Sequence, residues 1–181
     1  MKAILACERS GGIGANGSMP WPKQSKDLQR FKSLTKGCTV VMGRATWDAT
    51  GMPKPLPGRT NIVVTTSTDP IFPEYDVVYD PDTKVWSLNG MPNTSVAQVP
   101  DAATAAFNTT ADETWCIGGA KLFTAMLDNE LIHEIHLTRI RGDWVCDTFI
   151  DLKRIADEFE LVRDQLCLTH NYQIWKRKTD D

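Results

Sequence analysis

Two apolar runs limit the folds open to this chain more than any other feature of the sequence. Residues 39–42 are TVVM and residues 61–66 are NIVVTT, and neither run alternates regularly between polar and apolar side chains. Such runs are typical of strands that are buried on both faces, as in a parallel sheet with helices on either side. The chain is therefore expected to build a layered core around a central sheet.

The order of the other segments supports this architecture. Strand-like runs are expected at residues 2–7, 38–42, 61–66, 77–79, 114–117, 134–139, 160–168 and 172–177, and helical patterns at 25–35, 45–50, 100–108 and 120–128. In the first helix Leu28, Phe31 and Leu34 share one face, and Ser25 is the expected N-cap. Together these patterns predict an α/β fold with a mostly parallel central sheet, flanking helices and an antiparallel C-terminal edge.

Length and composition indicate one domain over residues 1–181. A chain of 181 residues with 41% apolar residues is long enough for one sizeable core. The Pro-, Asp- and Asn-rich stretch at 69–95 is expected to be a surface insertion, in which Asn89-Gly90 turns a small hairpin that starts with 85–88. No apolar run approaches the ~18 residues of a membrane span, so no membrane partner is expected.

The cysteines and histidines suggest neither a disulfide framework nor a metal site. The five cysteines are scattered and never spaced CxxC, which predicts a reducing, cytoplasmic location. The three histidines include His133 and His136, which have no third ligand evident nearby and are expected to be surface or sheet-edge residues. No metal is therefore expected.

Charge is distributed unevenly along the chain. Residues 1–60 carry ten Lys or Arg and three Asp or Glu, whereas residues 61–181 carry ten and twenty. A basic first third favours anion binding there. Its cations are separated by apolar residues, which favours small carboxylate or phosphate groups over nucleic acid. A solvated charge pattern without functional consequence remains the alternative.

Two turns each combine glycine, a cation and the start of a helix. VVMGRAT at 40–46 passes from a strand through Gly43 and Arg44, and WCIGGAKL at 115–122 passes through Gly118-Gly119 to Lys121. Free N–H groups at a helix N-terminus beside a cation bind anions, and glycine lets a phosphate approach the backbone. Two such turns indicate a ligand with separated phosphates, such as a dinucleotide. Neither turn matches the GxGxxG or Walker pattern.

A glycine-rich loop and a single acid complete the candidate site. Residues 11–21, GGIGANGSMPW, can cover a flat ligand with the apolar lip at their end, and a plain surface loop is the alternative. Asp27 is the sole carboxylate between Glu8 and Asp48 and lies one helical turn before Phe31. Such an acid can recognise an amidine-like nitrogen pair or move a proton. It can equally be an ordinary first-turn Asp that the helix dipole favours.

Taken together, these motifs resemble those of dihydrofolate reductases. In the family's order they are Ile13-Gly14, Met19-Pro20-Trp21, Asp27-Leu28 with Phe31-Lys32, Val41-Met42-Gly43-Arg44 with Thr46-Trp47, Leu56-Pro57-Gly58-Arg59 with Asn61-Ile62, Ile117-Gly118-Gly119 with Leu122-Phe123, Leu137-Thr138, and Gly142-Asp143 with Asp147-Thr148-Phe149. They cover nearly the whole chain apart from the segment around 69–95. The resemblance implies NADPH-dependent reduction of 7,8-dihydrofolate to tetrahydrofolate, with hydride transfer to C6 and protonation at N5.

On the substrate side, the resemblance implies that Asp27 pairs with the pterin and that Thr138 hydrogen-bonds that carboxylate. Arg59 would grip the glutamate α-carboxylate with its two-pronged guanidinium. The catalytic set is Asp27, Trp21 and Thr138, and the residues expected around the substrate are Cys7, Asp27, Leu28, Phe31, Lys32, Thr50, Leu56, Arg59, Ile117 and Thr138. No His, Cys or Tyr is expected in the pocket to supply the proton, so water would be the immediate donor.

On the cofactor side, the resemblance places Arg44 and Thr66 at the 2′-phosphate of NADPH and implies a cis Gly118-Gly119 bond. The residues expected around NADPH are Cys7, Ile13, Gly14, Met19, Gly43, Arg44, Ala45, Thr46, Thr65, Thr66, Ile117, Gly118, Gly119, Ala120, Lys121, Leu122 and Phe123. Ala45 stands where many members carry a basic or polar residue, and Thr50 stands where an aliphatic residue is common. Both departures bear on affinity and leave the implied chemistry intact. A monomer is expected.

Two other functions compete with this one. A reductase of the same fold that acts on a ribosylated pyrimidine in riboflavin synthesis shares the cofactor half, but it is not expected to carry the Asp27 helix together with Arg59. A non-catalytic folate- or nucleotide-binding protein has no need for both Asp27 and the apolar lip at the end of the loop. Oxidation of NADPH by dihydrofolate separates the three.

Overall fold

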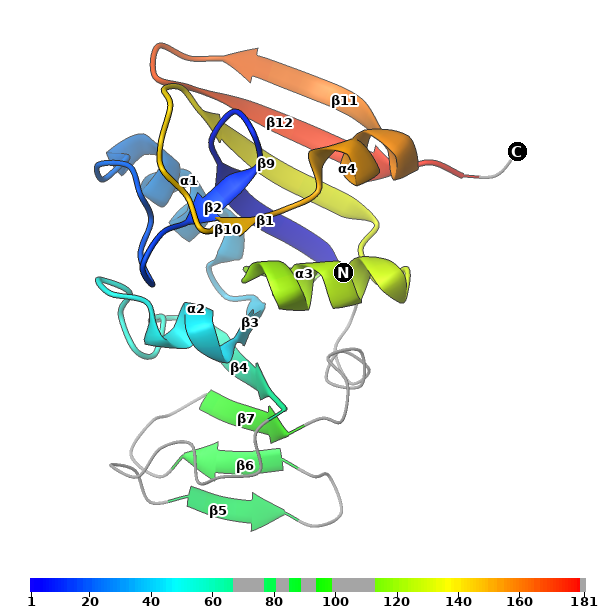
Figure 1. The fold of residues 1–181 in the computed structure, drawn as a ribbon. Coiled ribbons are helices and arrows are strands. Elements are labelled where there is room, and N and C mark those ends of the chain that lie inside the picture. Colours follow the sequence, from blue (N-terminus) through cyan, green and yellow to red (C-terminus); the bar gives the residue numbers. More distant parts are fainter. Residues whose placement is uncertain (67–76, 81–84, 89–93, 99–112, 180–181) are drawn as a thin grey trace.

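The computed structural model describes residues 1–66, 77–80, 85–88, 94–98 and 113–179. Within these ranges the elements are β1 (Lys2–Cys7), β2 (Gly12–Gly14), α1 (Ser25–Thr35), β3 (Thr39–Gly43), α2 (Arg44–Asp48), β4 (Thr60–Thr65), β5 (Val77–Asp80), β6 (Val85–Leu88), β7 (Thr94–Gln98), β8 (Thr114–Cys116), α3 (Ala120–Asp128), β9 (Glu134–Ile140), β10 (Thr148–Phe149), α4 (Leu152–Glu158), β11 (Phe159–Leu166) and β12 (His170–Arg177). Ten of these strands form one sheet in the order β11-β12-β9-β1-β8-β3-β4-β7-β6-β5 (Figure 1). The remaining pair, β10 and β2, lies apart as a small antiparallel sheet.

The centre of the large sheet is parallel and its edges are antiparallel. Strands β9, β1, β8, β3, β4 and β7 pair in parallel, whereas β12 runs antiparallel between β9 and β11. The predicted α/β fold with an antiparallel C-terminal edge is confirmed. At the other edge β5, β6 and β7 extend the sheet, so the stretch expected to be an insertion supplies strands to it. The Asn89-Gly90 turn and the helix expected at 100–108 lie outside the described residues.

The sheet is buried on both faces, as the apolar runs predicted. Val40, Val41 and Met42 of β3 have no exposed surface. Val41 belongs to the apolar cluster that contains Leu122 of α3, whereas its neighbour Val40 belongs to the cluster that contains Trp47 of α2. Phe31 and Leu34 of α1 pack against this second cluster. Figure 1 shows α3 in front of the sheet and α1 behind it. Burial of apolar area on both faces is the main source of stability in such a layered fold.

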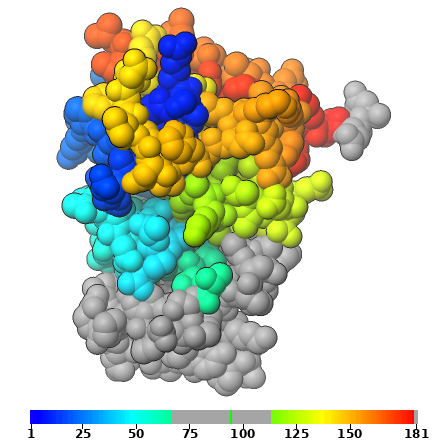
Figure 2. All heavy atoms as spheres, viewed as in Figure 1, coloured from blue at the N-terminus to red at the C-terminus, as the bar shows by residue number. Residues whose placement is uncertain are grey.

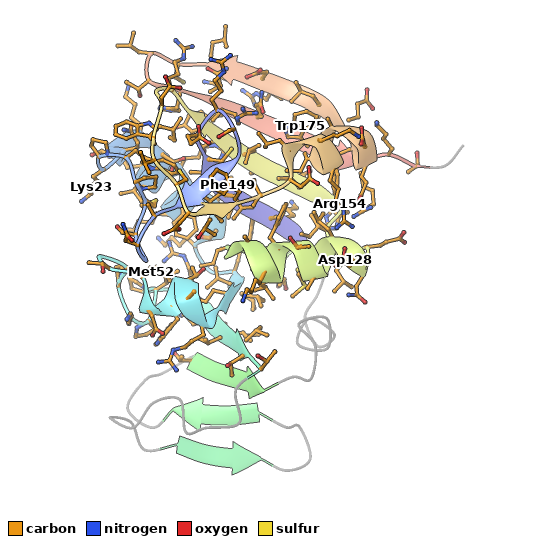
Figure 3. All side chains as sticks on the ribbon, in the orientation of Figure 1. Lys23, Met52, Asp128, Phe149, Arg154 and Trp175 are labelled. Carbon is orange, nitrogen blue, oxygen red and sulfur yellow. The ribbon has the colours of Figure 1, made fainter. Side chains whose placement is uncertain are left out.

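The helices are short and are fixed by a few local contacts. The longest described helix, α1, has 11 residues, and none in the described ranges is long and apolar enough to cross a membrane. Arg154 of α4 hydrogen-bonds Asp128 at the end of α3, which ties these two helices together (Figure 3). The expected Ser25 cap is wrong, because Gln24 is the N-cap of α1 and it makes no side-chain cap hydrogen bond.

The structure also differs from the sequence predictions in three places. It contains β2, β10 and α4, which sequence patterns missed because each is too short for periodicity to detect. The helix expected at 45–50 spans Arg44–Asp48. His136 is no sheet-edge residue, because β9 lies between β1 and β12 and its side chain is buried.

Candidate active site

The acid of the first helix lies against the central sheet. Asp27 is half-buried in the first turn of α1, and its Oδ1 accepts a 2.6 Å hydrogen bond from Thr138 Oγ1 of β9. Burial raises the pKa of Asp27 above its ordinary value, although the Thr138 hydrogen bond, His170 and Arg30 act in the opposite direction. A carboxylate held in this way can pair with an amidine-like group and can bias the site of protonation on a bound ring.

An apolar surface continues from Asp27 along the same face of the sheet. Phe31 of α1 and Ile117 after β8 are partly buried against the cluster that contains Leu56. Leu28 is half-buried and belongs to neither apolar cluster, whereas Thr50 is exposed. The sequence-predicted pocket residues on this face therefore include both core members and half-exposed side chains that a ligand can contact.

Arg59 is buried at the far end of this apolar surface. Its Nε donates to Thr35 Oγ1 at 2.7 Å and its Nη1 donates to the Pro57 carbonyl at 2.9 Å. The guanidinium also lies 5.3 Å from the centre of the Phe31 ring. Burial lowers the pKa of Arg59, yet a guanidinium stays charged at neutral pH. This fixed cation suits a carboxylate, while Lys32 on α1 is exposed.

The two glycine turns that the sequence singled out meet in space. Gly43 N donates to the Gly118 carbonyl at 2.8 Å, and Ile117 N donates to the Val41 carbonyl at 2.9 Å. The Gly118-Gly119 peptide bond is cis, as the resemblance implied. A Cβ on Gly119 would lie 3.3 Å from Thr46 Oγ1, so a side chain there would crowd the turn. The two turns thus form one cradle of backbone at the ends of β3 and β8.

The other residues expected at the cofactor differ in how they face solvent. Ala45, Lys121, Thr66 and Met19 are exposed, and Ile13, Gly14, Arg44 and Ala120 are half-buried. The side chains of Cys7, Leu122 and Phe123 point into the apolar cluster on the α3 face, and Thr65 is also buried. Burial raises the pKa of the Cys7 thiol to about 12. Cys7, Leu122 and Phe123 can therefore offer a ligand their backbone and not their side chains.

The glycine-rich loop at 11–21 is tied to the segment before α4. Gly12 and Gly14 of β2 pair with β10, and Asn16 N donates to Asp147 Oδ2 at 2.7 Å. Figure 2 shows this blue N-terminal segment beside the yellow-orange segment that contains β10. At the end of the loop the Trp21 side chain is buried, which anchors the chain before α1. The loop is therefore ordered by specific contacts at both ends.

Sequence reasoning missed Glu8, which holds the start of this loop. Its buried Oε1 accepts hydrogen bonds from Ser10 N, Ser10 Oγ and Gly12 N at 2.8, 2.5 and 2.8 Å. Burial raises the pKa of Glu8, but these hydrogen bonds outweigh it and leave the pKa below its ordinary value. The signal was weak, because a lone Glu before a glycine pair fits any turn.

Three further polar side chains that sequence reasoning did not connect with Asp27 lie on β12 and β9. His170 and Tyr172 of β12 act electrostatically with Asp27, and Tyr172 pairs across the strands with Thr138. His136 lies two residues before Thr138, on the same face of β9. Period-two alternation along β9 would have placed His136 beside Thr138. In the part of the chain that the structure describes, no three metal-binding side chains gather.

Comparisons with known proteins agree on one family. The family model for dihydrofolate reductase matches residues 1–173. Dihydrofolate reductase type 8 from Escherichia coli is 32% identical over 178 residues, which is 98% of this chain and 96% of the relative. A putative dihydrofolate reductase from Caenorhabditis elegans is 32% identical over 97% of this chain and 89% of its own length. A bifunctional dihydrofolate reductase-thymidylate synthase from Paramecium tetraurelia is 32% identical over 93% of this chain, which spans 31% of that protein.

Proposed function

The chain belongs to the dihydrofolate reductase family, and from this premise we propose that it reduces 7,8-dihydrofolate to 5,6,7,8-tetrahydrofolate with NADPH as the reductant. The observation that carries the proposal is the Asp27 carboxylate, held by Thr138 beside an apolar surface with Arg59 at its far end. A planar, amidine-bearing ring with an acidic tail matches this order of groups. The ten strands of the described sheet support a single domain over the length of the chain.

The substrate would lie along the α1 face of the sheet. Asp27 would bind the ring nitrogen and the 2-amino group of the pterin through two charge-assisted hydrogen bonds. The aromatic ring of Phe31 and the half-buried Leu28 would flank the aminobenzoyl group. Arg59 would bind the α-carboxylate, and its hydrogen bonds to Thr35 and Pro57 fix the direction of the guanidinium before the substrate arrives.

The residues present fit NADPH. Gly43 and Gly119 lie against each other: a Cβ on Gly43 would be in van der Waals contact with Gly119 N at 3.8 Å, and one on Gly119 would crowd Thr46 Oγ1 at 3.3 Å. No side-chain cap covers the N-terminus of α3, so its first N–H groups can bind a pyrophosphate oxygen. Arg44 would hold the 2′-phosphate beside Thr66, and Thr46 lies next to the Gly118-Gly119 turn. When bound, NADPH would supply the hydride for C6 of the pterin.

The protein's own contribution to the reaction is placement and charge. The ionised Asp27 favours a proton at N5 electrostatically, and water would deliver that proton because Asp27 pairs with the opposite side of the ring. Thr138 keeps the carboxylate in one orientation. The loop at 11–21, with Trp21 buried at its end, would exclude bulk water from the rings.

The test is oxidation of NADPH by dihydrofolate, followed as loss of the reduced-nicotinamide absorbance. Wild-type protein should oxidise NADPH only when dihydrofolate is present, and Asp27→Asn should be strongly impaired. A matched control is Asp157→Asn, which removes an exposed carboxylate from α4 and should leave turnover unchanged. Absence of turnover by folded wild-type protein would sink the proposal.

A further inference from the structure

Helix α1 is fixed on β9 by two polar contacts and not by apolar packing alone. Glu134, His136 and Thr138 lie two residues apart on β9, so their side chains share one face of the strand. Across this row, Asp27 accepts from Thr138 at 2.6 Å and Arg30 Nη2 lies 3.0 Å from His136 Nδ1. Because Asp27 and Arg30 are three residues apart, they share one face of α1.

The donors and acceptors in this row have only one consistent assignment. A guanidinium can only donate, so His136 Nδ1 must accept from Arg30. The proton of a neutral imidazole is then on Nε2, which donates to Glu134 Oε1 at 2.7 Å. Burial lowers the pKa of His136, which agrees with a neutral ring between Arg30 and Glu134. Arg30, His136 and Glu134 therefore form a directed chain of hydrogen bonds.

The guanidinium of Arg30 is held beside Asp27 without a carboxylate partner of its own. It stacks 4.7 Å from the centre of the Tyr172 ring, and Tyr172 is the cross-strand neighbour of Thr138. Its Nη1 is shielded from solvent and has no hydrogen-bond partner among the described residues. In the same part of the chain, no carboxylate oxygen lies within 4.0 Å of Arg30. No described carboxylate therefore neutralises the positive charge of Arg30 by direct contact, and this charge can act on Asp27.

The other polar groups around Asp27 do not supply a permanent charge. On β12, His170 is buried, and burial lowers its pKa below the ordinary value. Asp27 acts in the opposite direction, whereas Lys26 and Arg141 act in the same direction as burial. Tyr172 is neutral, because burial raises the pKa of its hydroxyl. On β9, Thr138 carries no charge and His136 is neutral by the argument above. Arg163 of β11 acts electrostatically on Arg30, where it adds to the lowering of the pKa by burial.

We propose that Arg30 is a positioning residue for Asp27, because its half-buried guanidinium, held by His136 and Tyr172, fixes α1 on β9 and supplies a positive charge that favours the ionised Asp27 carboxylate. Arg30 touches no reacting atom in this arrangement. Its consequence for catalysis rests on the proposed function, since it acts through the carboxylate that would bind the pterin. Its consequence for the charge of Asp27 does not depend on turnover.

The direct test measures the charge of Asp27 in the free protein. Protein labelled with 13C at the aspartate carboxyl carbon is titrated by NMR, and the Asp27 signal is identified by its loss in Asp27→Asn. Arg30→Met and Arg30→Gln remove the charge, and Gln keeps an amide donor for His136. Both should raise the pKa of Asp27 by about one pH unit, as expected for loss of a nearby opposite charge. Arg30→Lys should restore most of the wild-type value.

The matched control removes the same charge from the other end of the helix. Lys36 directly follows α1 and is exposed, so Lys36→Met should leave the Asp27 titration unchanged. Thermal melts show whether each variant is folded. A purely structural Arg30 predicts lower melting temperatures in Arg30→Met and Arg30→Gln without a shift in the Asp27 titration, and that result would overturn the proposal.

Kinetics provide the second readout. In Arg30→Gln the pH at which kcat/KM changes through Asp27 should move upward by the same amount as the NMR titration, and Arg30→Lys should move it back. If the wild-type protein fails to turn over dihydrofolate, the proposed function is wrong, and the NMR titration still tests the effect of Arg30 on Asp27. If the enzyme is active and its NMR titration is unshifted in the Arg30 variants, only the role of Arg30 is wrong.

Discussion

The two halves of the candidate site are built in different ways. On the substrate side, the groups offered to a ligand are charged side chains that are buried or half-buried, chiefly Asp27 and Arg59. On the cofactor side, they are backbone groups at Gly43 and Gly118-Gly119, together with the half-exposed Arg44. One half depends on which side chains are present, and the other depends mainly on the course of the backbone.

This difference predicts how each half responds to substitution. A charge in a buried, low-dielectric setting interacts strongly, and its loss leaves partners unpaired. A charge exposed to water is screened, and its loss costs little. Single substitutions should therefore have large effects on the substrate side and small effects on the cofactor side, except where a side chain is forced into a glycine turn.

The largest effect is expected for Asp27→Asn. Asn keeps the shape and can accept from Thr138, but it lacks the negative charge that we propose favours protonation at N5. The value of kcat/KM at neutral pH should fall by on the order of 10²-fold or more, and the deficit should shrink as acid supplies protonated substrate. NADPH affinity, measured by fluorescence titration, should barely change. Near wild-type turnover at pH 7 would contradict the role given to Asp27.

The same substitution should stabilise the fold at neutral pH. Because burial raises the pKa of Asp27 above its unfolded value, its contribution to stability is greatest below the unfolded pKa and is lost as pH rises through the folded pKa. Asn carries no charge at any pH, so Asp27→Asn avoids this loss of stability. Thermal melts of Asp27→Asn should therefore lie above those of the wild type at pH 7, and the difference should vanish at low pH. A lower melting temperature at pH 7 would show that the carboxylate stabilises the fold.

Arg59→Gln should have the next largest effect, and it should fall on KM. Loss of a charge-assisted pair costs roughly 1.5–3 kcal/mol, so KM for dihydrofolate should rise about 10- to 100-fold with a smaller change in kcat. Lys32→Gln removes an exposed cation from α1 and should raise KM less than about threefold. A dihydropterin without the glutamate tail is the control substrate. Equal losses with both substrates would mean that Arg59 only supports Thr35 and Phe31.

Gly12→Ala tests the exception, in which a side chain is forced into a glycine turn. A Cβ there would collide with Cys146 Sγ and Cβ, so β2 or the segment at Cys146 must shift. Displacement of the loop at 11–21 should lower kcat by about tenfold, within the range seen for misplaced active-site elements. Hydrogen exchange at residues 11–18 should speed up, and Gly12→Ala combined with Cys146→Gly should recover part of the protection. Unchanged exchange in Gly12→Ala would show that this loop is a passive connection.

Sequence patterns predicted the layered fold because its signals come directly from burial. The continuous apolar run at 39–42 and the apolar face of α1 are both patterns that burial explains, and both were placed correctly. Short elements such as β2 and β10 gave no period to detect. Ser25 failed as a cap because a cap depends on where the backbone turns, and Gln24 takes that position without a side-chain bond.

The candidate-site residues also divide into those that residue type reveals and those that depend on how the elements pack. The single acid Asp27 and the two glycine turns stood out by residue type, and the structure brings Asp27 to Thr138 and Gly43 to Gly118. The chain from Arg30 through His136 to Glu134 was missed, because it depends on which face of β9 packs on α1. The spacing of residues along β9 shows which side chains share a face, but it does not show which of the two faces packs on α1.

Arg44→Ala should have the smallest effect and tests the cofactor half directly. Arg44 Nε lies 2.6 Å from Asp48 Oδ2, and both side chains are more than a third exposed. A contact of Arg44 with a 2′-phosphate would therefore be screened and would compete with Asp48, so NADPH should bind about threefold to tenfold more weakly in Arg44→Ala, while NADH affinity should not change. Asp48→Asn should have the opposite sign, because it removes the competing carboxylate. An exposed i,i+4 pair is worth about 0.3–0.5 kcal/mol, which corresponds to NADPH binding about twofold tighter. Isothermal titration with both cofactors measures these differences. Equal loss of NADPH and NADH in Arg44→Ala would show that Arg44 supports α2 and does not read the phosphate.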